Sequence, residues 1–410
     1  MLTHQLERDN LVSGNYVPRE GLKEAKNAVF NDLIKVIVGP RRAGKSIFSV
    51  QLLKKTDFAY VNFDDERIAS VQNYDEILKG LKEVYGETKH VLFDEIQNLS
   101  RWELFVNRLQ RAGYNLILTG SNSRLLSTEL ATHLTGRHLP FQILPFSFKE
   151  FLRARKVAVD ETTELKERQG LMLHYLDDYM KTGGYPEVVL KKVESPDYLR
   201  LLVESVLFKD VAKRFNIRFS KKMYDLALYL ISNHSTEISS SKLKNILGFR
   251  SVHTVENYLG YLEEAFVVFT VRRFSFKLKE QLRAPRKVYA YDNGVINAYK
   301  FKISPDTGRL MENLVAVELL RRGTEYYYFR NSRGAEVDFV VKEGGKISAL
   351  VQVCYDVRAR EAEDRECRSL VKGSAELNCK NLIVITWDDE REEKRKDLII
   401  RFIPLWKWLL

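Results

Sequence analysis

Short apolar runs alternate with longer amphipathic stretches over the first third of the chain. Turn-forming residues bound the apolar runs, which are LIKVIVG, FAYVNFDD, HVLFDEIQ, NLILTGS and LPFQILPF. Between them, the hydrophobic spacing predicts helices at 45–55, 74–85 and 102–112. Buried strands separated by helices are typical of βαβ units, so residues 1–146 are predicted to surround a parallel sheet. Residues 1–30 are polar with weak helical periodicity, and we expect them to pack beside the first strand.

The pattern changes further along the chain. Residues 147–205 lose the strand signal and contain the helical segments SFKEFLRARK, ELKERQGLMLHYLDDYMKTGG and SPDYLRLLVESVLF. Residues 206–285 hold a helix, the short helix TEISSSKLKNILG, a turn, a second helix and a β-pair, which is the order of a winged helix-turn-helix. Residues 286–410 include the helix MENLVAVELLRRG, the strands EYYYFRN, EVDFVVKEG and KISALVQVCYD, a helix at 361–377 and the strand NLIVITWDD.

Composition and charge narrow the class of protein. The 410 residues carry a formal net charge of +11, which favours a polyanionic partner, although a solvated basic surface gives the same count. No apolar run reaches the roughly 18 residues of a membrane span. The N-terminus lacks the apolar region of a secretory signal, so we expect a cytoplasmic protein without a membrane partner. Three cysteines without metal-ligand spacing argue against a structural zinc site or a disulfide framework.

The segment GPRRAGKS is the first candidate for chemistry. Its G-x-x-x-x-G-K-S spacing is that of a phosphate-binding P-loop, and a buried strand precedes it while an amphipathic helix follows. Glycines at both ends let backbone N–H groups turn towards phosphate oxygens, Lys45 faces the β- and γ-phosphates of ATP, and Ser46 can ligate Mg²⁺. Either arginine of the loop is also placed to touch phosphate or a neighbouring protomer. The residues predicted to bind the nucleotide are Gly39, Pro40, Arg41, Arg42, Ala43, Gly44, Lys45, Ser46 and Ile47.

Two acids at the end of the run HVLFDEIQ form the second candidate. In a P-loop fold, Asp94 would hold Mg²⁺ and Glu95 would polarise the water that attacks the γ-phosphate. Two acids that cap a strand are the alternative. Their position about 50 residues after a P-loop favours the functional interpretation.

Polar residues that follow NLILTG form a third candidate. A neutral group there can hydrogen-bond the γ-phosphate or position the attacking water; we select Asn122 and leave Thr119 and Ser121 open, since such residues also form turns. Arg137 is the candidate for an arginine that stabilises transition-state charge, across a subunit interface, with a surface salt bridge as the alternative.

Together these motifs resemble a widespread prokaryotic family of AAA-type ATPases. GPRRAGKS, LFDEIQNL, LTGSNSRLL, TGRHLPFQILPFSFKEF, GGYPEVV, TVENYLGYLEEAFVV, RKVYAYDNG and RNSRGAEVDFVV follow in the family's order. The resemblance implies an α/β chain with an AAA-type P-loop ATPase core (1–146), a helical lid (147–205), a winged helix (206–285) and a restriction-endonuclease-like α/β domain (286–410). It also implies a homo-oligomer, because such domains usually complete their sites across a ring; a hexamer is one such arrangement.

DNA is the expected partner. Residues 251–263 would form the recognition helix, with Ser251, His253, Thr254 and Asn257 outward, although winged helices also dock proteins and this helix has only Arg250 as a cation. Residues 272–287 hold seven basic residues against one acid, with Phe274 and Phe276 interleaved, which suits phosphate neutralisation and base stacking. Alternation in RRFSFKLK equally suits a β-wing with one solvated face.

The last domain is predicted to have a nuclease-like fold that lacks nuclease activity. Asp338 falls at the first acid of the PD-(D/E)xK pattern, but Gln352-Val353-Cys354 replaces E-x-K, and Lys342 or Lys346 would have to reach in from a hairpin. Glu312 and Glu318 are candidate extra carboxylates, and all of these acids can be structural.

The leading hypothesis for the whole chain is an oligomeric ATPase that uses ATP and Mg²⁺ to act on DNA. The alternatives are a regulatory NTPase switch that docks a protein, and a Mg²⁺-dependent nuclease.

Overall fold

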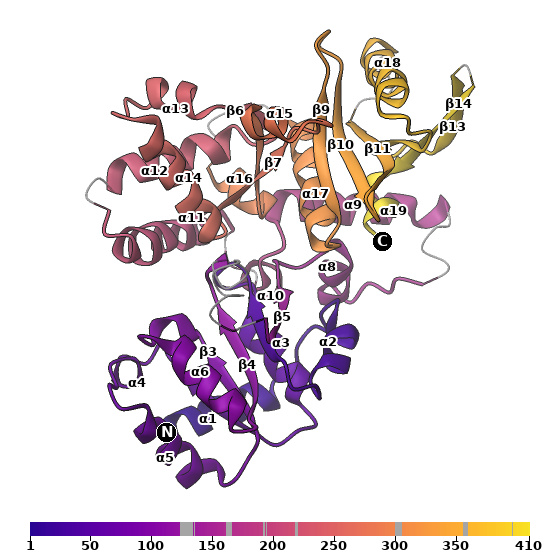
Figure 1. The fold of residues 1–410 in the computed structure, drawn as a ribbon. Helices are drawn as coiled ribbons and strands as arrows, with labels where there is room; N and C mark the ends of the chain where they lie inside the picture. Colours follow the sequence, from indigo (N-terminus) through magenta and orange to yellow (C-terminus); the bar gives the residue numbers. More distant parts are fainter. Residues whose placement is uncertain are drawn as a thin grey trace. The chain divides into compact units, whose positions relative to one another are not determined.

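The chain forms two compact units, Met1–Pro145 with Glu264–Phe266, and Phe146–Glu263 with Val267–Leu410. The computed structural model describes residues 1–123, 134, 136–160, 166–191, 193, 195–217, 220–299, 306–355, 360–395 and 397–410 (Figure 1). Among the described residues the first unit has one sheet and the second has two, and each unit has a buried hydrophobic cluster, so each is described by itself.

The first unit is built on a parallel sheet with the strand order β2-β3-β4-β1-β5. Its strands are β1 (Ile34–Val38), β2 (Phe58–Asn62), β3 (His90–Asp94), β4 (Asn115–Gly120) and β5 (His138–Gln142). Its helices are α1 (Leu2–Ser13), α2 (Leu22–Ala28), α3 (Lys45–Leu53), α4 (Glu66–Ala69), α5 (Tyr74–Tyr85), the 3₁₀ turn η1 (Ile96–Asn98) and α6 (Trp102–Arg111). The predicted strands and helices are confirmed. All of β1 is buried, as expected of a parallel sheet covered on both faces.

Helix α1 protects the edge strand β2 with polar contacts. The His4 Nδ1 atom accepts a hydrogen bond from the Asn62 backbone N–H at 2.9 Å, and Arg8 donates to the Phe58 carbonyl at 2.9 Å. Glu7 Oε1 lies 3.0 Å from both the Tyr60 hydroxyl and the Asn62 amide nitrogen. An edge strand with unpaired backbone groups invites unwanted pairing, so these contacts explain why a polar segment lies beside the sheet.

The second unit begins with helices, as the sequence predicts. They are α8 (Phe148–Ala154), α9 (Lys166–Thr182), α10 (Pro186–Lys191), α11 (Ser195–Ser205) and the π-helical turn η3 (Val206–Ala212). Ser147 and Glu150 form a reciprocal capping box that fixes the start of α8. Among the helices of the described ranges, none is long and apolar enough to cross a membrane.

Next come four helices and a small antiparallel sheet in the order β6-β8-β7. The elements are α12 (Ser220–Ser232), β6 (Thr236–Ile238), α13 (Ser240–Ile246), α14 (Val252–Glu264), β7 (Val268–Arg272), α15 (Leu278–Arg283) and β8 (Arg286–Ala290). The β-wing interpretation of RRFSFKLK is wrong. Strand β7 ends at Arg272 because Phe274 turns inward, where it is 7% exposed and joins the hydrophobic core of the last domain. Helix α15 then forms within the expected β-wing.

The last part of the chain follows the predicted order and extends it. Its elements are α16 (Asn293–Ala298), α17 (Thr307–Arg321), β9 (Glu325–Arg330), β10 (Glu336–Glu343), β11 (Lys346–Cys354), α18 (Arg360–Leu377), β12 (Leu382–Thr386), β13 (Arg391–Arg395), β14 (Leu398–Pro404) and α19 (Leu405–Leu409). They form a mixed sheet in the order β13-β14-β12-β11-β10-β9. The hairpin β13–β14 and helix α19 are additions that the hydrophobic pattern did not predict.

Asp292 connects the motifs GGYP and YDNG within this unit. Its Oδ2 atom accepts a hydrogen bond from the Gly184 N–H at 2.7 Å, and its Oδ1 atom accepts one from Val295 N–H at 3.3 Å. At Gly183, whose φ is +75°, an added Cβ would lie 2.1 Å from Asp292 Oδ1, so glycine is required. Burial raises the pKa of Asp292 to about 6, although the backbone donors oppose this shift.

Candidate nucleotide site

The P-loop joins the carboxyl end of β1 to the start of α3. Gly39 packs so closely that an added Cβ would lie 1.9 Å from the Ile143 carbonyl oxygen. Arg42 and Gly44 both have positive φ, of 65° and 93°. This alternation of backbone conformation curls the loop and turns successive N–H groups to one side, which makes a concave binding site for an anion.

Lys45 and Ser46 occupy the first turn of α3 beneath this loop. The Lys45 side chain is only 4% exposed; its Nζ atom donates to the Pro40 carbonyl at 3.1 Å and lies 3.5 Å from Glu95 Oε1. The Ser46 hydroxyl donates to Asp94 Oδ1 at 3.0 Å. The structure therefore brings the two motifs that the sequence predicted as partners into direct contact.

Asp94 ends strand β3 and is held by hydroxyl groups from three elements. Besides Ser46, Thr119 at the end of β4 donates to Asp94 Oδ1, and the Tyr60 hydroxyl of β2 lies 3.1 Å from Asp94 Oδ2. Tyr60 also contacts Glu7, so its single proton serves one of these carboxylates at a time. Burial, followed by the charge of Glu95, raises the pKa of Asp94 to about 6 despite the hydroxyl donors.

Glu95 has a strained backbone and an ionised side chain. Its φ and ψ of 52° and 45° lie in the left-handed region, where a non-glycine residue is held at a cost of about 1 kcal/mol or more. Its Oε2 atom accepts hydrogen bonds from the Gln97 amide at 2.5 Å and from the Ser121 N–H at 3.3 Å. Burial opposes ionisation, but Lys45 and these donors outweigh it and hold the pKa of Glu95 below its ordinary value.

Thr119 links the two acids. Its hydroxyl is fully buried, donates to Asp94 and accepts the backbone N–H of Glu95 at 3.0 Å. Strand β4 lies between β1 and β3, which places this side chain between the P-loop and the acids. Of the three candidate residues at this strand end, Thr119 therefore contacts the acids by its side chain and Ser121 by its backbone. Asn122 is buried at 6% exposure just beyond the strand, and its catalytic role stays a prediction.

Arg137 lies at the amino ends of the strands, whereas the P-loop lies at their carboxyl ends. It precedes β5, and its carbonyl accepts the N–H of Ile34, the first residue of β1, at 2.9 Å. The P-loop follows the last residue of β1, so the strand separates the two within one subunit. The Arg137 guanidinium is exposed and lies 3.4 Å from Gln110 Oε1. Its role across a subunit interface stays a prediction.

Arg19 is a site residue that the sequence did not reveal. It is 6% exposed and donates to the carbonyls of Ala43 at 2.7 Å and Leu144 at 2.6 Å. It therefore ties the P-loop to the segment after β5 and places a buried positive charge behind the loop. No local pattern marked this arginine, because it lies in a polar lead-in more than 20 residues before its partner.

The oxygen donors at this site suit Mg²⁺ and the loop suits a polyphosphate. The Ser46 hydroxyl and the Asp94 carboxylate offer oxygen ligands, which Mg²⁺ prefers. The two groups are hydrogen-bonded to each other, so they lie close enough to share one ion. Lys45 and the turned backbone N–H groups supply positive charge beside them. The remaining oxygen, Glu95 Oε1, stands on the Lys45 side, where it can accept a proton.

The predicted DNA-contact residues are partly exposed. Of the four residues predicted to lie outward, Ser251, His253 and Asn257 are exposed and Thr254 is half-buried, whereas Val255, Leu259 and Leu262 of α14 are buried. In residues 272–287, here called the basic segment, Phe274 and Lys287 are buried, so the expectation that they face a nucleic acid is wrong. The cations that stay exposed there are Arg272, Lys277, Lys279 and Arg283.

Comparison with known families agrees with the two-unit organisation. Residues 31–152 match the family model described as an AAA domain. Residues 173–307 and 307–408 match two domains of unknown function, DUF8612 and DUF4143.

Relatives extend over most of the chain. An uncharacterized protein of Methanocaldococcus jannaschii, MJ1544, is 37% identical over 397 residues, which cover 92% of this chain and 88% of the relative. An uncharacterized protein of Haemophilus influenzae is 30% identical over 344 residues, 80% of this chain and 83% of the relative. Among solved structures, the Walker-type ATPase PABY2304 of Pyrococcus abyssi aligns with a TM-score of 0.44 and 16% identity, over 70% of this chain and 99% of that one. The RuvB Holliday junction branch migration motor of Thermotoga maritima aligns with a TM-score of 0.32 and 14% identity, over 63% and 93%.

Proposed function

Because this chain has an AAA domain and belongs to one family with the Methanocaldococcus jannaschii protein MJ1544, we propose that it hydrolyses ATP with Mg²⁺ and acts on DNA as a homo-oligomer. One observation carries the proposal. The Ser46 hydroxyl and the Asp94 carboxylate lie 3.0 Å apart beside Lys45, and the ionised Glu95 faces the same lysine.

The proposed reaction is attack of water on the γ-phosphorus of ATP, with ADP and phosphate as products. Lys45 and the N–H groups of the P-loop bind the phosphate oxygens and stabilise the negative charge that shifts towards the β–γ bridge. Ser46 and Asp94 would hold Mg²⁺, which supplies charge neutralisation when bound. Glu95 orients the attacking water and accepts its proton, which its lowered pKa permits at neutral pH.

The position of Arg137 supports the proposed oligomer. Arg137 precedes the amino end of β5, whereas the P-loop follows the carboxyl end of β1, so we expect this guanidinium to stabilise transition-state charge in the site of another subunit. We therefore infer a homo-oligomer in which one subunit's Arg137 completes the neighbouring site, with a hexameric ring as one arrangement. The number of subunits has to be measured, by light scattering after size-exclusion chromatography with and without ATP.

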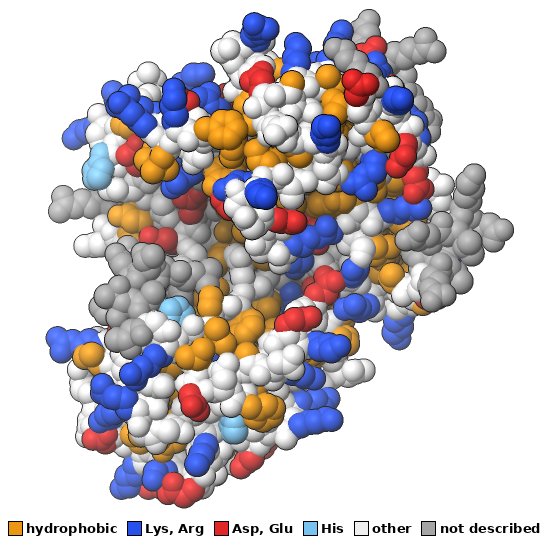
Figure 2. Space-filling view, turned by 45° about the vertical axis from the view of Figure 1, so that its right-hand side comes forward, with side chains coloured by type: hydrophobic (Ala, Val, Ile, Leu, Met, Phe, Trp, Pro, Cys, Tyr) orange, Lys and Arg blue, Asp and Glu red, His pale blue; other side chains and the backbone are white. Residues whose placement is uncertain are grey.

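The basic segment supports the DNA role. Its exposed cations accompany three large apolar side chains that are also exposed: Phe276 at 77%, Leu278 at 65% and Leu282 at 57%. Cations that neutralise phosphates beside an aromatic ring that can stack on a base suit a nucleic-acid strand. Helix α14 contributes less, since Val252–Glu264 contains no lysine or arginine and exposes Glu256. Lysine and arginine side chains are also widespread on the face drawn in Figure 2.

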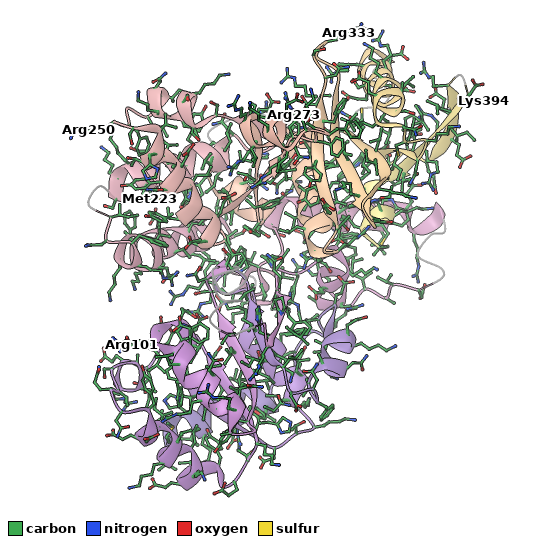
Figure 3. All side chains as sticks on the ribbon, in the orientation of Figure 1. Arg101, Met223, Arg250, Arg273, Arg333 and Lys394 are labelled. Atoms are coloured by element: carbon green, nitrogen blue, oxygen red, sulfur yellow. The ribbon has the colours of Figure 1, made fainter. Side chains whose placement is uncertain are left out.

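DNA-stimulated hydrolysis tests this proposal. ATP turnover is measured with and without single-stranded, duplex and branched DNA, and DNA affinity is measured by fluorescence anisotropy at several salt concentrations. Lys279→Ala with Arg283→Ala should lower the slope of log affinity against log salt by about 2, since two phosphate contacts are lost. Lys346→Ala with Lys394→Ala is the matched control, because both lysines are exposed and belong to β11 and β13, outside the basic segment; Figure 3 marks Lys394 on β13 and Arg273 at the basic segment. If no DNA binds at moderate salt or changes turnover, the DNA role fails.

A regulatory switch that docks a protein is the second candidate function. The observation that favours it is the outward face of α14, which carries Glu256 and neutral polar groups rather than cations. This function predicts slow ATP turnover that DNA leaves unchanged, with nucleotide-dependent capture of one protein partner that Glu256→Lys abolishes. A turnover rate that rises several-fold with DNA would exclude it in favour of the first proposal.

A further inference from the structure

A buried lysine stands among three carboxylates in the second unit. Lys287 of β8 has a side chain that is 4% exposed, and its Nζ atom lies 3.0 Å from Glu312, 2.6 Å from Glu336 and 3.1 Å from Asp338. Glu312 belongs to α17, whereas Glu336 and Asp338 belong to β10. An ammonium group has three N–H donors, so each carboxylate can take one of them.

The surrounding polar groups are satisfied as well. Glu312 Oε1 accepts the Tyr289 hydroxyl at 2.7 Å, and Asp338 Oδ2 accepts the Val353 N–H at 3.0 Å. Gln352 accepts the Asp338 N–H at 3.2 Å and donates to Glu366 at 2.6 Å. Buried charges persist only when they are paired and hydrogen-bonded, and this network meets both conditions.

The residues do not fit the divalent metal that an active nuclease-like centre needs. An ion bound to these oxygens would lie beside the Lys287 ammonium, and the two positive charges would repel each other. Neither predicted replacement lysine reaches the centre: Lys342 pairs with Glu325 at 2.9 Å, and Lys346 is exposed at the start of β11. Glu318, a predicted extra carboxylate, pairs instead with Arg321 at 3.3 Å and Arg322 at 2.8 Å.

We propose that the Lys287 ammonium occupies the cation position of this nuclease-like centre in place of a metal ion. The centre is thereby a structural joint that fixes strand β8 to α17 and β10, and it does not cleave phosphodiesters. Burial raises the pKa of Glu312, while the positive charge of Lys287 opposes that rise. This balance is consistent with a centre in which Lys287 compensates the carboxylates only in part. A relocated catalytic lysine would need a free donor or lone pair, and three carboxylates use the donors of Lys287.

Manganese binding tests this proposal in the full chain. An Asp94→Asn background removes the metal ligand of the nucleotide site, and free Mn²⁺ is followed by electron paramagnetic resonance without nucleotide. This background should leave Mn²⁺ free, whereas adding Lys287→Ala should create one Mn²⁺ site per chain. Adding Asp338→Asn to that variant should abolish the new site. In parallel, Mn²⁺ should raise the unfolding temperature of the Lys287→Ala variant and leave that of the background unchanged.

Two results would overturn the proposal. The first is Mn²⁺ binding, or Mn²⁺-dependent DNA cleavage, by the chain with Lys287 intact that Asp338→Asn removes; this measurement does not depend on the Lys287 variant folding. The second is a folded Lys287→Ala variant, as judged by retained circular dichroism, that neither binds Mn²⁺ nor gains thermal stability from it. The outcome does not depend on the proposed DNA-stimulated ATP hydrolysis, because none of these measurements uses ATP turnover.

Discussion

Thr119→Val removes the hydroxyl that connects both acids of the nucleotide site while keeping the side chain's shape. In the native protein this hydroxyl donates to the buried Asp94 carboxylate and accepts the Glu95 N–H at 3.0 Å. The valine leaves Asp94 with one donor fewer and leaves the Glu95 N–H without this partner. Both losses occur inside the protein, where water cannot replace the missing group easily.

The expected loss of activity follows from the negative charge of the Asp94 carboxylate, which accepts this hydrogen bond. A hydrogen bond to a charged group contributes about 1.5–3 kcal/mol, which corresponds to about a 10- to 150-fold decrease in kcat/KM for Mg²⁺ and ATP. A second effect is a change in pH dependence. Because the hydroxyl stabilises the ionised carboxylate, its removal raises the pKa of Asp94 further above about 6. The acidic limb of the pH–rate profile should therefore move to higher pH.

Steady-state turnover at several Mg²⁺ concentrations and pH values measures both effects. Thr119→Ser is the matched control, since it keeps the hydroxyl and loses only a methyl group, and its kcat/KM should stay within a few-fold of that of the native protein. Circular dichroism of each variant reports whether the sheet has folded. Native kcat/KM and an unshifted pH profile in folded Thr119→Val would refute the assignment of this hydroxyl to the catalytic acids.

Three further predictions concern single residues. Lys45→Ala should abolish tight ATP binding in a fluorescent-nucleotide titration, and unchanged turnover would contradict the site. Arg137→Ala should lower turnover by about 10³-fold, and mixing it with Lys45→Ala subunits should restore activity if the arginine serves a neighbour; full activity of Arg137→Ala alone would make it a surface residue. Lowering the pH from 7 to 5 should raise the native free energy of unfolding relative to that of Asp292→Asn by about 1 kcal/mol. The raised pKa of about 6 makes the folded state bind a proton that the unfolded state, at about 3.9, does not, so equal pH responses in denaturant titrations would contradict this cause.

Local patterns predicted the strands and helices of the first unit, but not which residue at the carboxyl end of a strand contacts the neighbouring acids. Strand β4 was visible as an apolar run, yet its register against β3 decides that the Thr119 side chain contacts Asp94. Register depends on pairing between segments more than 20 residues apart, which a single strand's pattern does not contain. Strand β1 even includes the buried Lys35, whose ammonium is satisfied by Asn31 and Asn115 from outside the strand.

Charged strands are the other gap in sequence-based prediction. Strand β13 reads REEKR and has no apolar alternation, but it forms the edge of the last sheet. Long-range ion pairs hold it there, between Arg391 and Glu363 at 2.5 Å and between Arg395 and Asp364 at 2.9 Å. Such pairs are set by the tertiary fold, because the partners lie about 30 residues away in helix α18.

Lys45 and Lys287 show why burial alone does not identify a functional lysine. Both side chains are 4% exposed and both face acids. Lys45 rests on one carbonyl at 3.1 Å and one carboxylate at 3.5 Å, and both contacts can be exchanged for phosphate oxygens at a loop lined with backbone donors. Lys287 gives its donors to three carboxylates that come from residues 25, 49 and 51 positions later in the chain, so releasing it would leave several buried negative charges uncompensated. The exchangeable lysine is the one suited to catalysis, and the saturated one is suited to holding the fold.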